Sequence, residues 1–588
     1  MNFRLFYGFI KDFFSHFSLR RKRQFGILVV LMVLTSFAEV LSIGAVLPFL
    51  GVLVAPEKVW EYSVIREFLG FFGVSSPGQL MLPITLFFVI AVLIAGAMRL
   101  LLVYFTTRLS YSVGADISYE IYRRTLYQPY VVHVMRNTSE VISGVTQKVD
   151  IVIQGLLVPL FTVISSLFIV SFVLVTLFSV DPLVSFAAFF GFGFIYILVV
   201  SITRRRLFRN STLVARNYTR VVKVLQEGLG GVRDVLINGD QEEYCRSYRD
   251  ADIPLRTAQA SSVFIGISPR YAAEAFGMAF IAVLAYFVVQ QRDGIEGAIA
   301  TLGVLALGAQ RLLPVFQQIY VSFVSIKSSE ASLHDVLKLL SQPIYVPYEN
   351  SRQHLGFQQS IELENIGFRY PDISDWVLRN LSLAIPKGSR IGFIGETGSG
   401  KSTLLDLIMG LLDPEEGAVF IDGQALTRDN YRQWQQRIAH VPQSVFLSDA
   451  SIRENIAFGV PEKNIDDDRV IRAARLAQLA KHIESLPEGY RTIVGERGVK
   501  LSGGQRQRIG IARALYRDAE LIVFDEATSA LDSETESSVM KSIEGLGENV
   551  TILIIAHRLS TLKNCDLVVE LASGKILRSG SFSSMVNG

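Results

Sequence analysis

The sequence contains few cysteines, few tryptophans and few charged residues for its length. Two cysteines, Cys245 and Cys565, occur among 588 residues, and they lie in different regions. This excludes a disulfide framework and a metal cluster held by cysteines. Charged residues make up 19% of the chain and the net charge is +3, so the composition does not indicate a nucleic-acid-binding protein. Hydrophobic residues make up 50% and the mean hydropathy is +0.37, which indicates a membrane protein with a soluble part.

Long hydrophobic runs are confined to the first part of the chain, up to about residue 325. Six of them reach the ~20 residues needed to cross a bilayer. They are predicted at 25–54, 83–105, 151–178, 183–203, 261–289 and 298–322. Further on, short Val/Ile/Leu strands alternate with amphipathic helices, which is typical of an α/β domain. We therefore predict a membrane α-helical domain at 1–327, a linker at 328–358 and a soluble α/β domain at 359–588.

Arginine and lysine are concentrated before the first predicted span and in two long connections, 106–150 and 204–260. The opposite loops are short or poor in positive charge. By the positive-inside rule, we expect the N-terminus, both connections and the C-terminal domain to be cytoplasmic. This predicts a multi-pass protein of the plasma (inner) membrane. DNA binding by these basic runs is disfavoured, because they flank membrane spans.

Two segments outside the spans have amphipathic patterns. In residues 1–19 apolar side chains recur at helical spacing, and the charges follow the apolar face instead of preceding it. This order argues against a signal peptide and favours a helix lying on the inner leaflet. Residues 57–73 are predicted to form either a second amphipathic helix or an ordered external loop.

A phosphate-binding loop follows the predicted strand Arg390–Ile394 and opens the predicted helix Thr403–Met409. Its residues are Gly395, Glu396, Thr397, Gly398, Ser399, Gly400, Lys401 and Ser402. The glycines let backbone N–H groups wrap phosphates, Lys401 is expected to reach the β- and γ-phosphates, and the Ser402 hydroxyl is expected to bind Mg²⁺. We therefore predict ATP and Mg²⁺ as cofactors, with Thr403 also in contact with ATP.

Two carboxylates follow a second buried strand that begins at Leu521. Asp525 is predicted to hold Mg²⁺ through water, and Glu526 to act on the attacking water. A second anion site is predicted just before the helix Arg506–Tyr516. It consists of Ser502, Gly503, Gly504 and Gln505. One nucleotide needs only one cradle, so the second implies a phosphate presented by another copy of the domain.

With these motifs the chain resembles the ATP-binding cassette (ABC) family, over 361–586 by motif and over the whole chain by layout. The resemblance implies that Tyr370 stacks on adenine and that Gln443 forms a Q-loop that contacts Mg²⁺ and the reacting water. It also implies a signature at Leu501–Gln505 and a D-loop at Ser529–Asp532 that brings Asp532 to ATP. His557 is implied to sense the γ-phosphate. The segment Thr492–Gly498 resembles the X-loop of exporters, although Ile493 stands where an acidic residue is usual. All motor motifs are intact, which favours a homodimer with two working sites.

Six spans fused to one cassette resemble an ABC exporter half-transporter. The resemblance implies coupling helices near Tyr122–His133 and Val222–Leu236, which transmit cassette closure to the spans. An ATPase-gated channel is the alternative from another class. It is disfavoured because Glu526 and His557 are intact, and ATP hydrolysis without ion conductance would discriminate the two.

Three arginines inside predicted spans are the candidate substrate residues, because charges in a membrane are costly and usually functional. Arg99 and Arg311 are predicted to lie about 24 Å and 20 Å below the outer membrane surface, and Arg270 about 12 Å above the inner surface. All three positions fall in the cytoplasmic half of the membrane. An inward-open cavity that binds an anion explains this convergence. The alternative is structural pairing, of Arg270 with Glu274 and of Arg99 or Arg311 with Glu39.

Short segments of the membrane half resemble lipid-linked oligosaccharide flippases of the PglK type. They are the stretches 36–49, 268–274 and 310–314. This resemblance implies a polyprenyl-pyrophosphate glycan turned from the inner to the outer leaflet, with the pyrophosphate as the anion. Export of another amphipathic lipid or of hydrophobic drugs is the alternative within the same class.

Overall fold

The computed structural model describes residues 15, 17–54, 56–60, 76–180, 182–291, 295–344, 355–371, 375–528, 530–545, 549–556 and 558–587. They form two compact units. One comprises residues 1–128 and 136–344, and the other residues 129–135 and 345–588. The predicted amphipathic helix at 1–19 and the segment 57–73 lie largely outside the described residues. The predicted boundaries at 327 and 359 stay a prediction.

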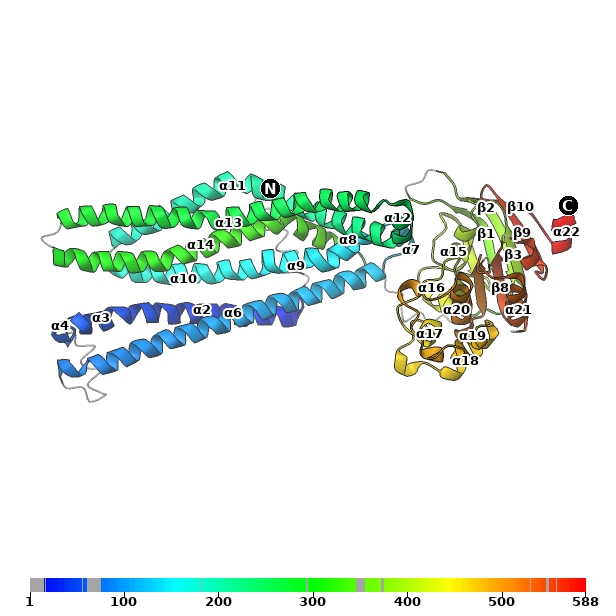
Figure 1. The fold of residues 1–588 in the computed structure, drawn as a ribbon, viewed down its shortest axis with the longest axis horizontal. Coiled ribbons are helices and arrows are strands. Elements are labelled where there is room, and N and C mark those ends of the chain that lie inside the picture. The colour runs from blue at the N-terminus through cyan, green and yellow to red at the C-terminus, as the bar shows by residue number, and fades with distance from the viewer. Residues whose placement is uncertain are drawn as a thin grey trace. The chain divides into compact units, whose positions relative to one another are not determined.

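The first unit is made of helices, several of them much longer than a bilayer is thick (Figure 1). They are α2 (Leu19–Gly44), α3 (Val46–Val54), α4 (Pro56–Trp60), α6 (Met81–Leu126), α8 (Thr138–Ser143), α9 (Val149–Val152), α10 (Val158–Val180), α11 (Pro182–Gly230), α12 (Val232–Asn238), α13 (Gln241–Gln291) and α14 (Ile295–Leu340). Among the described residues, three helical stretches are long and apolar enough to cross a membrane: Leu19–Ser42, Pro77–Leu126 and Thr138–Val175. The other three predicted spans fall in α11, α13 and α14, partly on side chains outside the description.

The helices of this unit form a hairpin and a bundle. Helix α2 packs along α6, while α11, α13 and α14 pack on one another and α10 packs on α14. A buried core joins the two groups near the predicted cytoplasmic end, where Leu28 and Leu109 meet Val152 and Leu337. Toward the end that carries α3 and α4, the hairpin runs apart from the bundle (Figure 1).

Two prolines change the predicted course of the spans. The first predicted span, 25–54, is divided into α2 and α3 at Ala45, because the ring of Pro48 clashes with the carbonyl four residues before it. Pro159 likewise removes a donor to Gly155, and a π-helical segment, Ile153–Leu157, lies there. A second π-helical segment spans Gly144–Lys148. Gly155 allows this bulged helix to approach α14, since a Cβ there would lie 2.8 Å from that of Ser329.

The second unit is the α/β cassette, built on two sheets. A sheet in the order β2-β1-β4-β5 contains β1 (Ser360–Phe368), β2 (Leu378–Pro386), β4 (Glu416–Ile421) and β5 (Gln424–Ala425). A sheet in the order β10-β9-β3-β8-β7-β6 contains β3 (Arg390–Ile394), β6 (Ile438–Val441), β7 (Leu521–Asp525), β8 (Thr551–Ile555), β9 (Leu567–Ala572) and β10 (Lys575–Gly580). Strands β6, β7, β8, β3 and β9 are parallel, and β10 runs antiparallel to β9.

Helices cover the cassette sheets and form a separate helical part. They are α15 (Lys401–Ile408), α16 (Tyr431–Gln435), α17 (Ile452–Ile456), α18 (Asp467–Leu476), α19 (Ala480–Glu484), α20 (Gly503–Tyr516), α21 (Ser533–Glu544) and α22 (Phe582–Asn587). Two cores hold the unit together, one between the sheets and α15, and one between the larger sheet and α17 to α21. The short helix α7 (Tyr130–Met135) belongs to this unit, and its Val131 packs against the first core.

Candidate ATP-binding and transport sites

The phosphate-binding loop lies between β3 and α15, and its geometry requires glycine. Gly395, Gly398 and Gly400 have φ of 143°, 84° and 99°, which residues with a side chain rarely adopt. A Cβ on Gly395 would lie 2.2 Å from the carbonyl oxygen of Leu571. The Lys401 ammonium donates hydrogen bonds to the carbonyl oxygens of Gly395 and Glu396, each at 2.8 Å. These bonds fix a positive charge at the loop.

The predicted motifs follow the carboxyl ends of four neighbouring parallel strands. The phosphate-binding loop follows β3, position 557 follows β8, Asp525 ends β7 and Gln443 follows β6. In open α/β sheets, ligands bind at this edge. The topology therefore gathers segments that lie far apart in the sequence.

Gln443 and Glu526 are in direct contact. The Nε2 of Gln443 donates a hydrogen bond to Oε2 of Glu526 at 2.6 Å. Glu526 has a φ of 50°, a strained value for a residue other than glycine and one often found at active sites. Its backbone N–H donates to the carbonyl of Ile555, which ties the end of β7 to β8. The structure thus brings together the two residues predicted to act on the reacting water.

The carboxylates beside the phosphate-binding loop perturb each other. Burial raises the pKa of Asp525, a hydrogen bond from Ser402 lowers it, the charge of Glu526 raises it and Lys401 lowers it. Burial raises the pKa of Asp406 to about 6, with a further contribution from Asp525. The Ser402 hydroxyl, the Asp525 carboxylate and the Gln443 amide are the oxygen donors that suit Mg²⁺, so the residues present fit this ion.

The signature serine and Asp532 both begin helices. The Ser502 Oγ accepts a hydrogen bond from the backbone N–H of Gln505 at 3.2 Å, and Gln505 Oε1 accepts one from the Ser502 N–H at 2.8 Å. Asp532 caps α21 by accepting from the N–H of Thr535 at 2.9 Å, and this bond lowers its pKa. Gln507 in α20 accepts from the N–H of Ala530 at 2.9 Å, which joins the signature helix to the predicted D-loop.

Tyr370 lies beside the first core, against which Val131 of the helix α7 also packs. Its ring packs edge-on against Phe368, with centroids 5.1 Å apart. Burial raises the pKa of Tyr130 in α7, and Asp406, Tyr370 and Asp525 add to this rise. Sequence reasoning expected a coupling helix near here but did not single out Tyr130 or Asp406, because no motif marks either residue.

The predicted sensor His557 and the D-loop residue Ser529 lie outside the described residues. Their neighbours meet at a buried carboxylate, Glu536 of α21. Glu536 accepts hydrogen bonds from the hydroxyls of Thr528 at 2.9 Å and Thr561 at 2.7 Å, and from Arg558 at 3.2 Å. One carboxylate therefore links the segment after β7 with the segment after β8. Sequence reasoning missed this residue, since a lone glutamate in a helix carries no signal.

Two of the three membrane arginines, Arg99 and Arg270, form ion pairs. Arg99 lies 3.4 Å from Glu39 of α2, with side chains 50% and 9% exposed. The Nε of Arg270 lies 2.7 Å from Oε1 of Glu274, with side chains 58% and 36% exposed. The structural alternative is therefore seen for both. The side chain of Arg311 lies outside the described residues. The predicted convergence of the three arginines stays a prediction.

Ile493, in the segment that resembles an X-loop, is 42% exposed and forms an isolated β-bridge with Ser451. Both residues line a cavity of about 940 Å³ in the helical part of the cassette. The backbone bridge thus anchors this segment, while the side chain of Ile493 is exposed.

Comparisons with known proteins match both units. The transmembrane region of ABC transporters matches residues 25–307, and the ABC transporter ATP-binding domain matches 378–529. An ATP-dependent lipid A-core flippase of Cupriavidus metallidurans is 31% identical over 82% of this chain and 81% of its own, and that of Alkalilimnicola ehrlichii is 32% identical over 68% and 67%. A solved ATP-bound bacterial Atm1-family ABC exporter has a similar fold, with a TM-score of 0.76, 24% identity and 96% coverage of both chains.

A helical membrane unit joined to a nucleotide-binding α/β cassette defines an ATP-driven membrane transporter. The chain belongs to the ABC transporter family and has the exporter arrangement. The predicted fold class is confirmed, and so are the ATPase activity coupled to transport and the multi-pass membrane character.

Proposed function

We propose that this exporter flips an amphipathic lipid with a glycan head group, specifically a polyprenyl-pyrophosphate-linked oligosaccharide, from the inner to the outer leaflet. Relatives named lipid A-core flippases support the lipid class. Another amphipathic lipid or a hydrophobic drug remains the alternative cargo. The proposal includes a plasma (inner) membrane location with the N-terminus and the cassette in the cytoplasm.

The observation that carries this proposal is the exposure of two arginines, Arg99 and Arg270, on apolar helices. Charged side chains within a membrane do not face lipid without a large cost. Arg99 and Arg270 are half exposed or more in the single chain, so they require a polar surface that the chain alone does not provide. A central cavity that receives a polar head group meets this requirement. A guanidinium has five N–H donors, so pairing with one carboxylate leaves donors for a phosphate.

At the ATP site we propose that Lys401 binds the β- and γ-phosphates, Tyr370 stacks on adenine and Glu526 orients the attacking water. Ser402, Asp525 and Gln443 would hold Mg²⁺, which neutralises charge on the triphosphate. The contact of Gln443 with Glu526 at 2.6 Å supports a role for both at the reacting water. We further assign the γ-phosphate contact to His557.

We also propose a homodimer, in which Ser502, Gly503, Gly504 and Asp532 complete the ATP site of the partner. The described contacts of the Ser502 side chain stay within its own capping box, which leaves its N-terminal face for a second copy. Helix α12 exposes Leu236 at 60% and Ile237 at 72%. Such an apolar helix face on a long extension is typical of a docking surface.

Flipping assays in proteoliposomes test the cargo, with a fluorescent polyprenyl-pyrophosphate glycan in the accessible leaflet. We expect Arg270→Ala to lose most flipping while basal ATPase activity stays, and Arg270→Lys to recover part of it because charge is kept without the planar fork. Arg256→Ala is the matched control, since Arg256 lies on the same helix and pairs with a carboxylate, Asp252, four residues away.

The double variant Arg270→Ala with Glu274→Ala separates the two roles of the pair. If the pair serves only folding, removing both partners restores both folding and flipping. Restored flipping would therefore refute substrate binding by Arg270, whereas lost flipping in a well-folded double variant would support it.

A further inference from the structure

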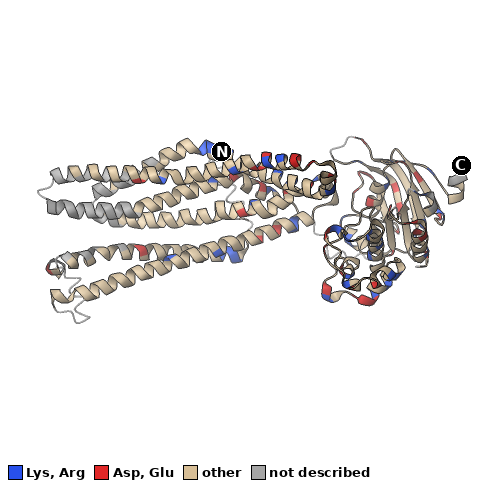
Figure 2. Cartoon of the chain, viewed as in Figure 1, with Lys and Arg blue, Asp and Glu red and all other residues tan. Residues whose placement is uncertain are grey.

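A cavity of about 590 Å³ lies between the start of α2 and the middle of α6. Its polar side is formed by Arg20, Arg21 and Arg108. Its apolar side includes Ile27 and Phe105, which are 70% and 48% exposed. In Figure 2 basic residues, coloured blue on the ribbon, cluster at this end of α2. The cavity therefore combines positive charge with an apolar wall that continues along the helices.

The positive charge of this cavity is only partly balanced. Arg21 donates to Asp116 at 2.7 and 3.2 Å and is neutralised by it. Arg108 donates to the hydroxyl of Tyr104 at 2.6 Å. Within the part of the chain that the structure describes, neither Arg20 nor Arg108 has a carboxylate within ion-pair distance, and no acidic residue lines the cavity. Among the described residues, two arginine charges thus face the same space without a carboxylate partner.

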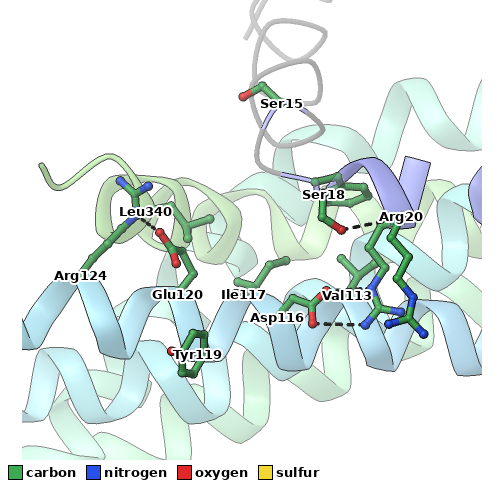
Figure 3. A pocket seen from close by; sticks show the side chains of 12 residues that line it. Ser15, Ser18, Arg20, Val113, Asp116, Ile117, Tyr119, Glu120, Arg124 and Leu340 are labelled. Atoms are coloured by element: carbon green, nitrogen blue, oxygen red, sulfur yellow. Dashed lines mark hydrogen bonds and ion pairs between the residues drawn. The ribbon is translucent and has the colours of Figure 1, made fainter. Parts of the chain in front are cut away.

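A neighbouring cavity of about 660 Å³ provides a comparison (Figure 3). It shares Arg20 and Arg21 but is also lined by Asp116 and Glu120. Glu120 is held by Arg124 at 2.7 Å. The charges of this second cavity are mixed and largely paired, so it does not favour an anion. Of these two cavities the first has the larger excess of positive charge, with three arginines and no carboxylate against three arginines and two carboxylates, and it lies beside the exposed Ile27 and Phe105.

We propose that the cavity between α2 and α6 binds the head group of an anionic phospholipid of the surrounding bilayer, held as a resident ligand and not transported. Arg20 and Arg108 contact the phosphate, and the acyl chains lie against Ile27 and Phe105. Basic pockets between membrane helices at a membrane surface are suited to such head groups. The position fits a lipid, because Arg20 lies in the basic first turns of α2, just before the apolar run that begins at Phe25. The site is independent of the proposed cargo.

The test uses the full-length transporter in nanodiscs of phosphatidylcholine with increasing phosphatidylglycerol, and counts retained lipids by native mass spectrometry. We expect the wild type to retain phosphatidylglycerol in preference to phosphatidylcholine. Arg20→Ala with Arg108→Ala should weaken phosphatidylglycerol binding on the order of 30-fold, from two lost charge contacts. Arg246→Ala with Arg256→Ala removes the same charge from exposed positions on α13, outside the cavity, and should change nothing.

Two outcomes would overturn the proposal. In one, the variant at positions 20 and 108 retains phosphatidylglycerol as tightly as the wild type. In the other, it loses phosphatidylcholine and phosphatidylglycerol alike, which would show that the cavity does not recognise charge. Selective loss of phosphatidylglycerol would support the proposal, provided that all variants reconstitute into proteoliposomes equally well.

Discussion

Replacing Asp406 with asparagine should remove a pH dependence from the stability of the cassette. Asp406 lies in α15, and its pKa is raised from 3.8 to about 6 by burial and by Asp525. A carboxyl group whose pKa rises on folding stabilises the folded state at pH values below its pKa in the unfolded chain. That contribution is lost as the pH rises through the folded pKa. The loss should therefore occur between about pH 4 and pH 6.

The size of this effect follows from the shift. About two pKa units correspond to at most about 3 kcal/mol, and we expect on the order of 2 kcal/mol once solvent screening is allowed for. From about pH 4.5 to about pH 7.5, wild type should lose that much more stability than Asp406→Asn. For a domain of this size the difference is about 4 to 8 °C in Tm.

Tryptophan fluorescence during heating, without nucleotide, measures this difference. Two of the three tryptophans, Trp376 and Trp434, lie in the cassette, and Trp434 is fully buried. Asp429→Asn, which removes an exposed carboxylate of the same domain, should keep the wild-type pH slope. Parallel pH profiles for wild type and Asp406→Asn would refute the reasoning, and so would a lower Tm of Asp406→Asn at pH 7.5.

Three further predictions concern the motor and the assembly. Glu526→Gln should bind ATP, keep the cassettes associated and lose nearly all turnover; steady-state hydrolysis near the wild-type rate would contradict the assignment. Purified protein should be a dimer of about 131 kDa, twice 65.4 kDa. In a variant whose two native cysteines are replaced by serine, cysteines introduced at Ser399 and Ser502 should cross-link two chains. A cross-link within one chain would exclude the composite site. Glu536→Gln should lower ATP turnover roughly tenfold with the KM for ATP nearly unchanged, because it loosens the segments that flank the sensor position; an unchanged kcat would show that this carboxylate serves stability alone.

The cassette could be predicted closely because its motifs bind phosphate through local backbone geometry. The predicted strand Arg390–Ile394 coincides with β3, and the second buried strand coincides with β7 at Leu521–Asp525. The φ values of Gly395 and Gly400 leave almost no other residue for the loop. Local constraints of this kind are readable without knowing the fold.

Contacts between distant helices could not be read from the sequence in the same way. The sequence left open whether Glu39 pairs with Arg99 or with Arg311, because helical spacing does not say which spans face each other. The break at Ala45 and the π-helical segment before Pro159 arise where a proline removes a backbone hydrogen-bond donor. A hydropathy pattern carries no information on such lost donors. Asp406 raises the pKa of Tyr130 across elements far apart in the sequence, because α7 belongs to the same compact unit as the cassette.

ATP-driven flipping of a glycan-bearing lipid can be measured directly as exchange of the lipid between the leaflets of proteoliposomes. A fluorescent polyprenyl-pyrophosphate glycan, lipid A-core and a hydrophobic dye would be compared, with wild type and Glu526→Gln, with and without ATP. We predict ATP-dependent loss of the polyprenyl-pyrophosphate glycan from the accessible leaflet with wild type only. Hydrolysis of ATP by wild type without movement of this lipid, while lipid A-core or the dye is moved, would contradict it.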